Sequence, residues 1–437
     1  MSLSRVNSRK CSEPGDRVKE REFALGIDFG TTHIKATIVN FVNLHRIRSV
    51  VMNWTELGLD RTFVCDWFSA INLIITAVLT EQSVLGGYGQ YVRTVAISAT
   101  APTIALCSTD TPTRGIGGPS VSPIINYDEH ITDGEIEELD SRARKSRTEY
   151  VVDRLFPLTP STAGDTVLLS ATGLLNWYLT GVFSIDRSSR YELGLSPDDN
   201  KVLNAHVPFR RLGCDEPVAE VRGVLCERWG LRGDTLVMAG SSDTFALGIG
   251  GALKPGRGLV CLGTFFGLLE TDEEMRQPKK YEAHGEPYRW RVASPIGSTI
   301  ERTAASWYPC EPDTGSRIRL LLEAAIHESS GPQKRCVISY RPWRNNSSVR
   351  ELPIVTADAE AAGVGLVANS LLKNFATALG DQVRSLDLDT LVVAGGLSRY
   401  DRLVSYIEES SALHFESDPR IWAAEGAAVL AASVAGT

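Results

Sequence analysis

Two aspartates of this sequence stand where a carboxylate can do chemistry, and Asp28 is the first. It ends an apolar run and comes just before the turn Gly30-Thr31-Thr32. A carboxylate beside bound phosphates commonly serves Mg²⁺ through the water molecules that this ion retains. An aspartate at the end of a strand can equally cap its own turn. The residues alone leave both interpretations open.

The second aspartate is Asp243, which follows Gly240-Ser241-Ser242 and opens an apolar stretch that runs through Ala252. Aspartate is a favoured N-cap, so capping alone would explain it. A helix N-terminus would also favour the ionised carboxylate. A charged carboxylate in a cleft can orient and deprotonate a substrate hydroxyl. Asp243 is therefore either a helix cap alone or a residue that also acts as a general base.

Three glycine turns can bring backbone N–H groups close to an anion, and threonine hydroxyls add donors. They are Gly30-Thr31-Thr32, Gly263-Thr264 and Gly395-Gly396-Leu397-Ser398. A single glycine-threonine turn is common in sheets that bind nothing. Two such turns in different halves of the chain, together with a third turn between a strand and a helix, can hold a nucleoside triphosphate from both sides.

The elements around these turns repeat one theme. Alternation of apolar residues predicts strands over 23–30 and 34–39, which form a hairpin around the first turn. Strands over 258–262 and 265–270 flank the second turn in the same way. A buried strand over 391–394 precedes the third turn, and a helix is expected from about residue 401. The repetition predicts a duplicated α/β architecture with a cleft between two lobes.

Further elements complete the predicted lobes. Helical periodicity covers 63–80 and 166–180, the latter ending at Gly181, and a strand over 235–239 leads to the helix of Asp243. Strands are expected over 92–98 and 104–107. We expect a flexible polar tail over 1–21, an N-terminal domain over 22–240 and a C-terminal domain over 241–437.

Composition narrows the function classes. The chain has 437 residues with 43% hydrophobic and 22% charged residues, which excludes a disordered, collagenous or coiled-coil chain and predicts two domains. A net charge of −8 disfavours nucleic acid and anionic membranes as partners. The sequence shows no signal peptide or spanning segment, and its eight cysteines lack metal-binding spacing, so we expect a cytoplasmic protein.

Several motifs occur together in a specific order. They are Gly26-Ile-Asp-Phe-Gly-Thr-Thr-His-Ile-Lys-Ala36, Leu175-Asn-Trp-Tyr-Leu-Thr-Gly181, Ala239-Gly-Ser-Ser-Asp-Thr-Phe-Ala-Leu-Gly248, Leu262-Gly-Thr264, Ala394-Gly-Gly-Leu-Ser398 and Glu425-Gly-Ala-Ala-Val-Leu-Ala-Ala432. In this order the chain resembles the FGGY carbohydrate kinase family, within the superfamily of actin and the heat-shock chaperone ATPases. The resemblance runs from about residue 23 to the C-terminal end.

The resemblance implies two actin-like (ribonuclease-H-like) domains that close on ATP and on a sugar or polyol, a pentulose such as xylulose or ribulose. It implies in-line transfer of the γ-phosphoryl group, with Asp243 as catalytic base in contact with the substrate and Asp28 on the magnesium ion. The implied nucleotide contacts are Gly30, Thr31 and Thr32 in the first turn, Gly263 and Thr264 in the second, and Gly395, Gly396 and Ser398 on the adenosine side.

The implied sugar site departs from the family pattern. The segment 97–103 lies where members contact the sugar, and there Thr100, Ala101 and Pro102 replace the usual glutamine, variable residue and histidine. Asp128 matches a substrate-binding aspartate of the family. Lys35, on the second strand, is interpreted as a solvated strand residue, with a phosphate contact as the alternative.

Two other functions stay open. A weakened member of the family could bind nucleotide or sugar and act as a regulatory protein, which the departures at 100–102 motivate. A chaperone-like or actin-like ATPase is the third hypothesis, although no substrate-peptide domain follows the two lobes. The expected partner is a small sugar or polyol, without nucleic acid or membrane, and a homodimer is an open alternative to a monomer.

Overall fold

The computed structural model describes most of the chain outside several loops. The described residues are 22–80, 87–101, 103–108, 124, 166–193, 209–251, 253, 256–263, 266–271, 288–294, 296–327, 350–351, 364–386, 388–417 and 423–433. The predicted tail over 1–21, Asp128 and Thr264 lie outside these residues.

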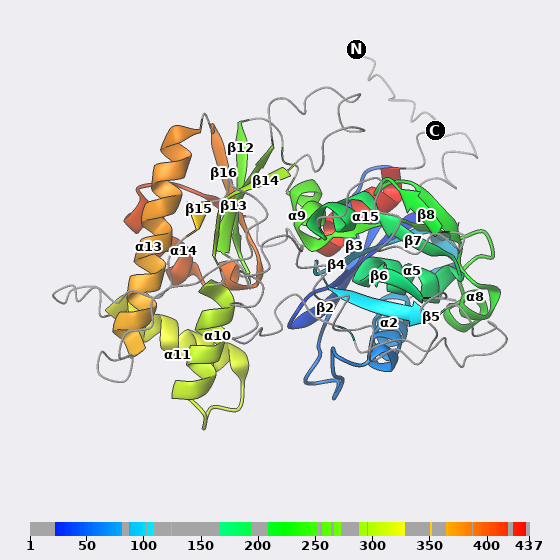
Figure 1. The fold of residues 1–437 in the computed structure, drawn as a ribbon, viewed down its shortest axis with the longest axis horizontal. Helices are drawn as coiled ribbons and strands as arrows, with labels where there is room; N and C mark the ends of the chain where they lie inside the picture. Colours follow the sequence, from blue (N-terminus) through cyan, green and yellow to red (C-terminus); the bar gives the residue numbers. More distant parts are fainter. Residues whose placement is uncertain are drawn as a thin grey trace, which may run out of the picture.

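Two lobes stand side by side, each built on a mixed sheet (Figure 1). The described strands of the first sheet are β1 (Phe23–Phe29), β2 (His33–Asn40), β3 (Arg46–Asn53), β4 (Val92–Ala99), β9 (Pro217–Glu220), β10 (Leu236–Met238) and β11 (Ser241–Ser242). Those of the second sheet are β12 (Arg257–Leu262), β13 (Phe266–Thr271), β14 (Tyr288–Ser294), β15 (Arg350–Glu351), β16 (Thr390–Ala394) and β17 (Glu416–Ser417). Two small ribbons pair β5 (Ile104–Ser108) with β6 (Thr166–Ser170) and β7 (Phe183–Asp186) with β8 (Phe209–Leu212).

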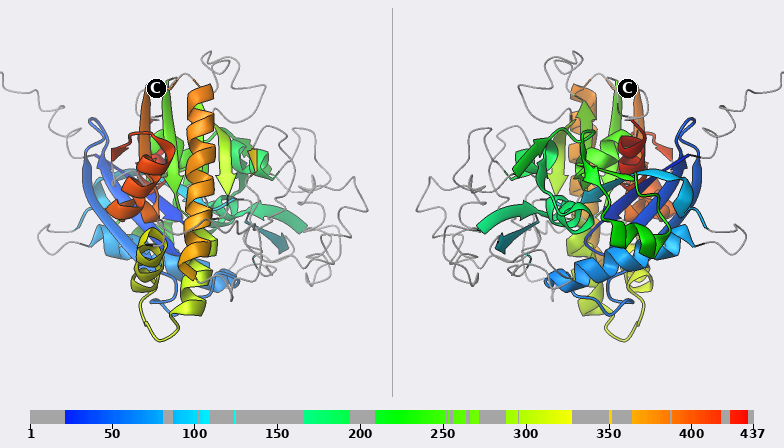
Figure 2. Two further views of the ribbon diagram at one scale, coloured as in Figure 1. Left: turned by 90° about the vertical axis from the view of Figure 1, so that its left-hand side faces the viewer. Right: turned by 90° about the vertical axis from the view of Figure 1, so that its right-hand side faces the viewer.

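Helices cover both sheets. In the first lobe they are α2 (Val64–Leu79), the 3₁₀ turn η1 (Gly89–Tyr91), α5 (Ala171–Thr180), α6 (Arg187–Glu192) and α8 (Gly223–Trp229). The second lobe contributes α10 (Ile296–Trp307), α11 (Thr314–His327), α13 (Val364–Ser385), the 3₁₀ turn η6 (Gly396–Arg399) and α14 (Asp401–Ser411). The long α13 runs along the face of the second sheet that points away from the first lobe (Figure 2).

The two sheets share one topology, which confirms the predicted duplication. The order in the first sheet is β3-β2-β1-β4-β10, and in the second β14-β13-β12-β16-β17. In each, the first three strands run antiparallel to one another in turn, and the last two run parallel to the third, central strand. The central hairpin of each sheet carries one of the predicted glycine turns.

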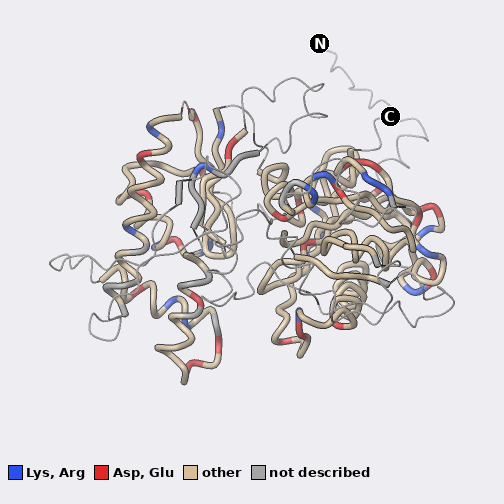
Figure 3. Tube along the Cα trace, in the orientation of Figure 1, with Lys and Arg blue, Asp and Glu red and all other residues tan. Residues whose placement is uncertain are grey.

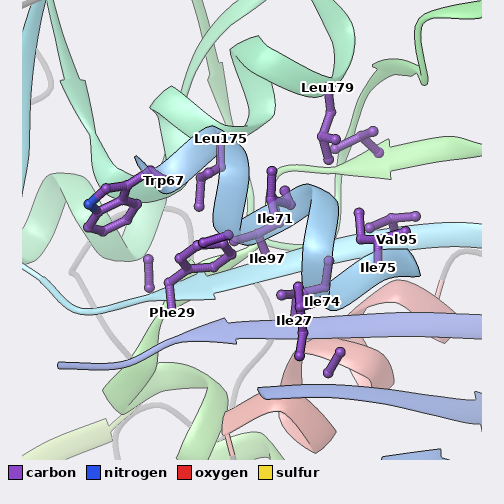
Figure 4. Close-up of a cluster of buried hydrophobic side chains, with 14 of the residues drawn as sticks. Ile27, Phe29, Trp67, Ile71, Ile74, Ile75, Val95, Ile97, Leu175 and Leu179 are labelled. Atoms are coloured by element: carbon purple, nitrogen blue, oxygen red, sulfur yellow. The ribbon is translucent and has the colours of Figure 1, made fainter. Parts of the chain in front are cut away.

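Alternation along β1 decides which side chains meet the core. Leu25, Ile27 and Phe29 point into the cluster formed with α2, α5 and α8, part of which is drawn in Figure 4. Successive side chains of a strand point to opposite faces. Gly26 and Asp28 therefore lie on the other face of the sheet, and two helices from later in the chain cover that face.

These two helices are α9 (Asp243–Gly250) and α15 (Ala423–Ala432), which pack on each other and, through α15, on β1. α9 lies on the side of the first lobe that faces the second (Figure 1), and its Leu247 packs against the second sheet. The chain therefore crosses back to the first lobe at its C-terminal end. The division into domains at residue 240 stays a prediction.

One predicted helix is partly wrong. Residues 166–170 form the strand β6, antiparallel to β5, and the helix begins only after Ser170. The Ser170 hydroxyl accepts a hydrogen bond from the Gly173 amide, which makes it the N-cap. A short run of apolar residues such as Val167 to Leu169 does not distinguish a buried strand from a helical turn. The predicted end at Gly181 is confirmed, with a left-handed φ of 84°.

Charged residues of both signs are interspersed over the described parts of the two lobes (Figure 3). No helix within the described ranges has the length and apolar character that crossing a membrane requires.

Candidate active site

A polar row crosses the first sheet on the face that carries Asp28. Asp28 stands opposite Lys35 on β2 and opposite Ser98 on β4, and Ser98 is in turn the partner of Ser241 on β11. Residues in register on neighbouring strands point to the same face. Four strands thus place a lysine, an aspartate and two serines in one line, which ends two residues before Asp243.

Asp28 is almost completely buried and is held by two neighbours. Its Oδ2 lies 3.1 Å from Lys35 Nζ, and its Oδ1 accepts a hydrogen bond of 3.4 Å from the Ser98 hydroxyl. The Lys35 side chain is 24% exposed. The interpretation of Lys35 as a solvated strand residue is therefore wrong, since its ammonium group pairs with the carboxylate at the predicted site.

Asp243 is the first residue of α9 but not its N-cap. The cap is Ser242, whose hydroxyl accepts a hydrogen bond from the Phe245 amide. The Asp243 carboxylate accepts one from the Thr244 amide at 2.8 Å. Because Ser242 caps the helix, capping does not explain why an acidic residue stands at position 243.

Burial and, to a smaller degree, the nearby negative charge of Asp28 raise the pKa of Asp243 to about 7, although the Thr244 amide and Lys35 act in the opposite direction. The amide at the helix end favours the ionised carboxylate, as expected, but burial has the larger effect. Part of the Asp243 surface still reaches solvent. A carboxylate with a pKa near 7 accepts a proton efficiently at neutral pH.

The first glycine turn is held in place by Trp54, which is buried. The Trp54 indole N–H donates to the Gly30 carbonyl at 3.0 Å, and its backbone N–H donates to the Thr32 carbonyl at 3.3 Å. Gly30 N–H donates to the His33 carbonyl at 3.1 Å. These bonds fix the path of the turn from behind, because they engage two of its carbonyl oxygens.

The other two glycine turns lie together in the second lobe. Gly395 has a φ of 107°, and a Cβ on it would lie 2.6 Å from the Leu262 carbonyl and 2.9 Å from Gly263 N. The Ser398 hydroxyl and amide both bond the Gly395 carbonyl. Only glycine fits this contact. Gly263, Gly395 and Ser398 are thus brought into one place, while Gly396 is exposed.

Contacts across the lobes bring the first turn toward the second lobe. The Thr32 hydroxyl donates to Glu301 Oε1 of α10 at 3.4 Å. Burial, the charge of Lys35 and, least, the charge of Arg399 lower the pKa of His33 to about 4. Arg399 follows the third turn, so this effect places His33 near that turn. Asp243 in the first lobe raises the pKa of Cys261 on β12, after the larger effect of burial.

The predicted sugar residues are only partly described. Thr100 is buried, and both its hydroxyl and its amide donate to the Phe29 carbonyl, so these donors support the end of β1. Ala101 is partly exposed. Asp128 lies outside the described residues. Sequence reasoning missed Trp54 and Glu301, and it undervalued Lys35, although the hairpin register alone places Lys35 opposite Asp28.

The residues present fit a hydrated magnesium ion. No group of three or more potential ligands among His, Cys, Asp and Glu occurs in the described part of the chain. Mg²⁺ keeps several waters and is usually held by one or two carboxylates together with substrate phosphates. Asp28 supplies that kind of site. Asp243 lies near enough for the charge of Asp28 to raise the pKa of Asp243.

The support given by Trp54 is testable with Trp54→Phe, which removes the indole donor and keeps an aromatic ring. We expect ADP affinity to fall about threefold to tenfold, because an unpaired buried carbonyl costs ~1–3 kcal/mol and the turn relaxes to satisfy it. Isothermal titration measures the affinity. Trp229→Phe is the matched control, since that buried indole N–H has no partner within the described structure. Equal ADP affinity of both variants and wild type would refute the role of Trp54.

No protein-family model and no curated protein sequence matches the chain. Solved structures do match. Xylulose kinase from Lactobacillus acidophilus, in a ligand-bound crystal structure, has a TM-score of 0.67 and 14% identity, with 95% of this chain and 90% of that chain covered. Gluconate kinase from the same organism has a TM-score of 0.65 and 14% identity, with 95% and 89% covered.

Glycerol kinase from Plasmodium falciparum, crystallised with ADP, has a TM-score of 0.63 and 14% identity, with 94% of this chain and 89% of that chain covered. At these identities the likeness establishes the fold. The chain has the two-lobed, actin-like α/β fold of the carbohydrate kinases, and the predicted fold class is confirmed.

Proposed function

We propose that this protein is an ATP-dependent carbohydrate kinase of the FGGY family that transfers the γ-phosphoryl group of ATP to a hydroxyl of a sugar or polyol. The observation that carries the proposal is the position of Asp243. This carboxylate has a pKa near 7, and it lies close to the ion pair of Asp28 and Lys35 and to β12, which leads into the second glycine turn.

The chemistry follows from these groups. Asp243 accepts the proton of the sugar hydroxyl as the oxygen attacks the γ-phosphorus, the bond between this phosphorus and the bridging oxygen of ATP breaks, and ADP leaves. Lys35 neutralises part of the charge on the phosphates, and the glycine turns orient them through groups other than the Gly30 amide, which is bonded within its own turn. A bound Mg²⁺, held by Asp28 through water, would neutralise the charge of the β- and γ-phosphate oxygens. Positioning and charge neutralisation supply most of the rate enhancement in phosphoryl transfer.

For the acceptor we propose a pentulose. Several of the similar structures are of xylulose kinases, and gluconate and glycerol kinases are also similar. In this chain Thr100 directs its donors to the backbone, and Ala101 has no polar side chain. We therefore expect few side-chain hydrogen bonds to the sugar from this segment and a modest preference among pentuloses.

The proposal is tested by measuring ADP release from ATP against a panel of ketoses, aldoses and polyols. The kinase proposal predicts turnover with at least one acceptor and little ADP without an acceptor. Tight ADP binding without turnover on any acceptor would instead favour a regulatory protein of the same fold. ADP release that no acceptor stimulates would favour an ATPase.

The pKa of Asp243 sets the expected pH dependence. The active form is the ionised base, and burial raises its pKa to about 7. We therefore expect kcat/KM for the sugar to be constant above about pH 8 and to fall tenfold per pH unit below about pH 6. Steady-state kinetics from pH 5 to 9 measure this profile. A plateau that extends down to pH 5 would contradict the assigned base.

A further inference from the structure

A buried carboxylate stands behind the segment that carries Asp243. Asp186 ends β7, is 1% exposed, and accepts two hydrogen bonds at Oδ1, from the Ser188 hydroxyl at 2.6 Å and from the Ser189 amide at 2.8 Å. Ser188 Oγ in turn accepts a hydrogen bond of 2.7 Å from the Ser242 amide. Ser242 directly precedes Asp243, so this chain of bonds ends beside the proposed base.

We infer that Asp186 and Ser188 are positioning residues for phosphoryl transfer: Asp186 orients the Ser188 hydroxyl so that its oxygen accepts the Ser242 amide, and this bond fixes where Asp243 is aimed. The inference deepens the proposed kinase function and rests on it. Neither residue is placed in contact with substrate.

The direction of the two bonds follows from the donors. The Ser242 N–H can only donate, so Ser188 Oγ must accept from it. A hydroxyl has one proton, and in Ser188 that proton goes to Asp186 Oδ1. Without this acceptor the hydroxyl would be free to rotate its proton toward Ser242, where it would meet another donor. The carboxylate therefore sets the polarity of the chain.

Other contacts hold the same segment at its upstream end. The Asn176 amide donates to the Ala239 carbonyl at 2.8 Å, and the Thr172 hydroxyl donates to the Ser241 carbonyl at 3.3 Å. A Cβ on Gly240, whose φ is 75°, would lie 2.0 Å from the Ile97 carbonyl. These contacts fix residues 239–241 against α5 and β4. Ser188 extends the support by one residue, to the beginning of α9.

The cost of burying Asp186 argues that the carboxylate is there for more than stability. Its Oδ2 has no hydrogen-bond partner within the described structure, and burial raises its pKa. A buried polar atom without a partner is unfavourable, and an apolar residue would avoid that cost. An oriented acceptor for Ser188 is the benefit that the geometry offers in return.

The test uses Ser188→Ala in the full chain, with Ser184→Ala as the matched control. Ser184 lies on the same strand as Asp186, and its buried hydroxyl has no partner within the described structure. For Ser188→Ala we expect kcat to fall about 10–100-fold with KM for ATP within about twofold, because a small misplacement of a catalytic group costs that much. Ser184→Ala should match wild type.

Two measurements on the unliganded protein test the inference without relying on activity. Hydrogen–deuterium exchange of the peptide that contains Ser242 should be faster in Ser188→Ala. The ¹³C signal of the Asp243 carboxyl should titrate at a lower pH than in wild type, because a less constrained side chain reaches more water and burial is the main cause of its raised pKa. The charged or titratable groups that face Asp243, namely Asp28, Lys35 and Cys261, are unchanged in the variant.

Unchanged exchange at Ser242 and an unchanged Asp243 midpoint in Ser188→Ala would overturn the inference, even if kcat fell. If Ser188→Ala does not fold, Asp186→Asn provides the same measurements, since asparagine keeps the volume and introduces a donor toward Ser188; the same two outcomes then decide. Failure to phosphorylate any sugar would refute the kinase proposal. The exchange and titration results would still show whether Ser188 and Asp186 position Asp243.

Discussion

Asp243→Asn is expected to lower kcat for sugar phosphorylation by about a thousandfold or more and to leave ADP affinity within about twofold. A general base contributes roughly 10²–10⁴ in rate, and asparagine has no basic oxygen at neutral pH. The amide keeps the shape of the side chain and an acceptor for the Thr244 amide. Quenched-flow or steady-state kinetics measure the loss, and calorimetry measures the affinity.

The same variant carries an internal control of folding. Because the folded state raises the pKa of Asp243 above its ordinary value of 3.8, the protonated form is favoured by folding, and the stability contributed by this group falls as pH rises from about 4 to about 7. Asparagine removes that penalty. We expect its Tm to exceed that of wild type at pH 8 and to equal it near pH 4. Asp381→Asn, at an exposed ion pair of the second lobe, should change neither activity nor this pH dependence.

Retention of more than about a tenth of wild-type kcat by Asp243→Asn would contradict the assignment of the base. A large loss of ADP affinity would also contradict it, because the side chain would then act in nucleotide binding rather than in proton transfer.

Gly426→Ala is expected to give the largest loss of stability. Gly426 lies on α15, and a Cβ there would be 1.7 Å from the Ala246 carbonyl of α9. Both groups are backbone or fixed to it, so the helices must separate. Overpacking of this kind costs ~1–3 kcal/mol and occasionally more. We expect the free energy of unfolding to fall by at least ~3 kcal/mol and Tm by about 6 °C or more, measured by calorimetry.

Gly223→Ala is the matched control for this prediction. Gly223 is the first residue of α8, and a Cβ there would meet nothing within 4 Å. Alanine is the better helix former, so we expect Tm to stay the same or to rise slightly. Equal Tm values for the two variants would mean that α9 and α15 are not in this close contact.

Much of the fold was predictable because strong local signals agree with it. The alternation around Gly30 gives the first hairpin, and the repeated strand–turn–strand near Gly263 gives its counterpart. The strand β6 was not predictable, because three consecutive apolar residues suit a helix or a buried strand equally. The return of α15 to the first sheet depends on the close fit of Gly26 against Ala424 and Ala428, a tertiary contact that no local pattern encodes.

The site was predictable at its turns and less so at its charges. Asp28, Gly263 and Gly395 lie where the motifs place them on the elements. The raised pKa of Asp243 was not predictable, because it arises from burial between elements far apart in sequence. The N-cap role of Ser242 was not predictable either, because the sequence does not show whether the Ser242 or the Asp243 side chain accepts the hydrogen bond from the first turn of the helix. Trp54 was missed because a tryptophan gives no sign of where its indole N–H is directed.

The central claim is that Asp243 directs a sugar hydroxyl, and not water, onto the γ-phosphorus of ATP. Mass spectrometry of the products formed in H₂¹⁸O with the best acceptor of the panel tests it most directly. We predict a sugar phosphate without ¹⁸O in its phosphoryl group, formed in equal amount to ADP by the wild type and absent with Asp243→Asn. Inorganic phosphate labelled with ¹⁸O as the main product, or equal yields of sugar phosphate from both proteins, would contradict the claim.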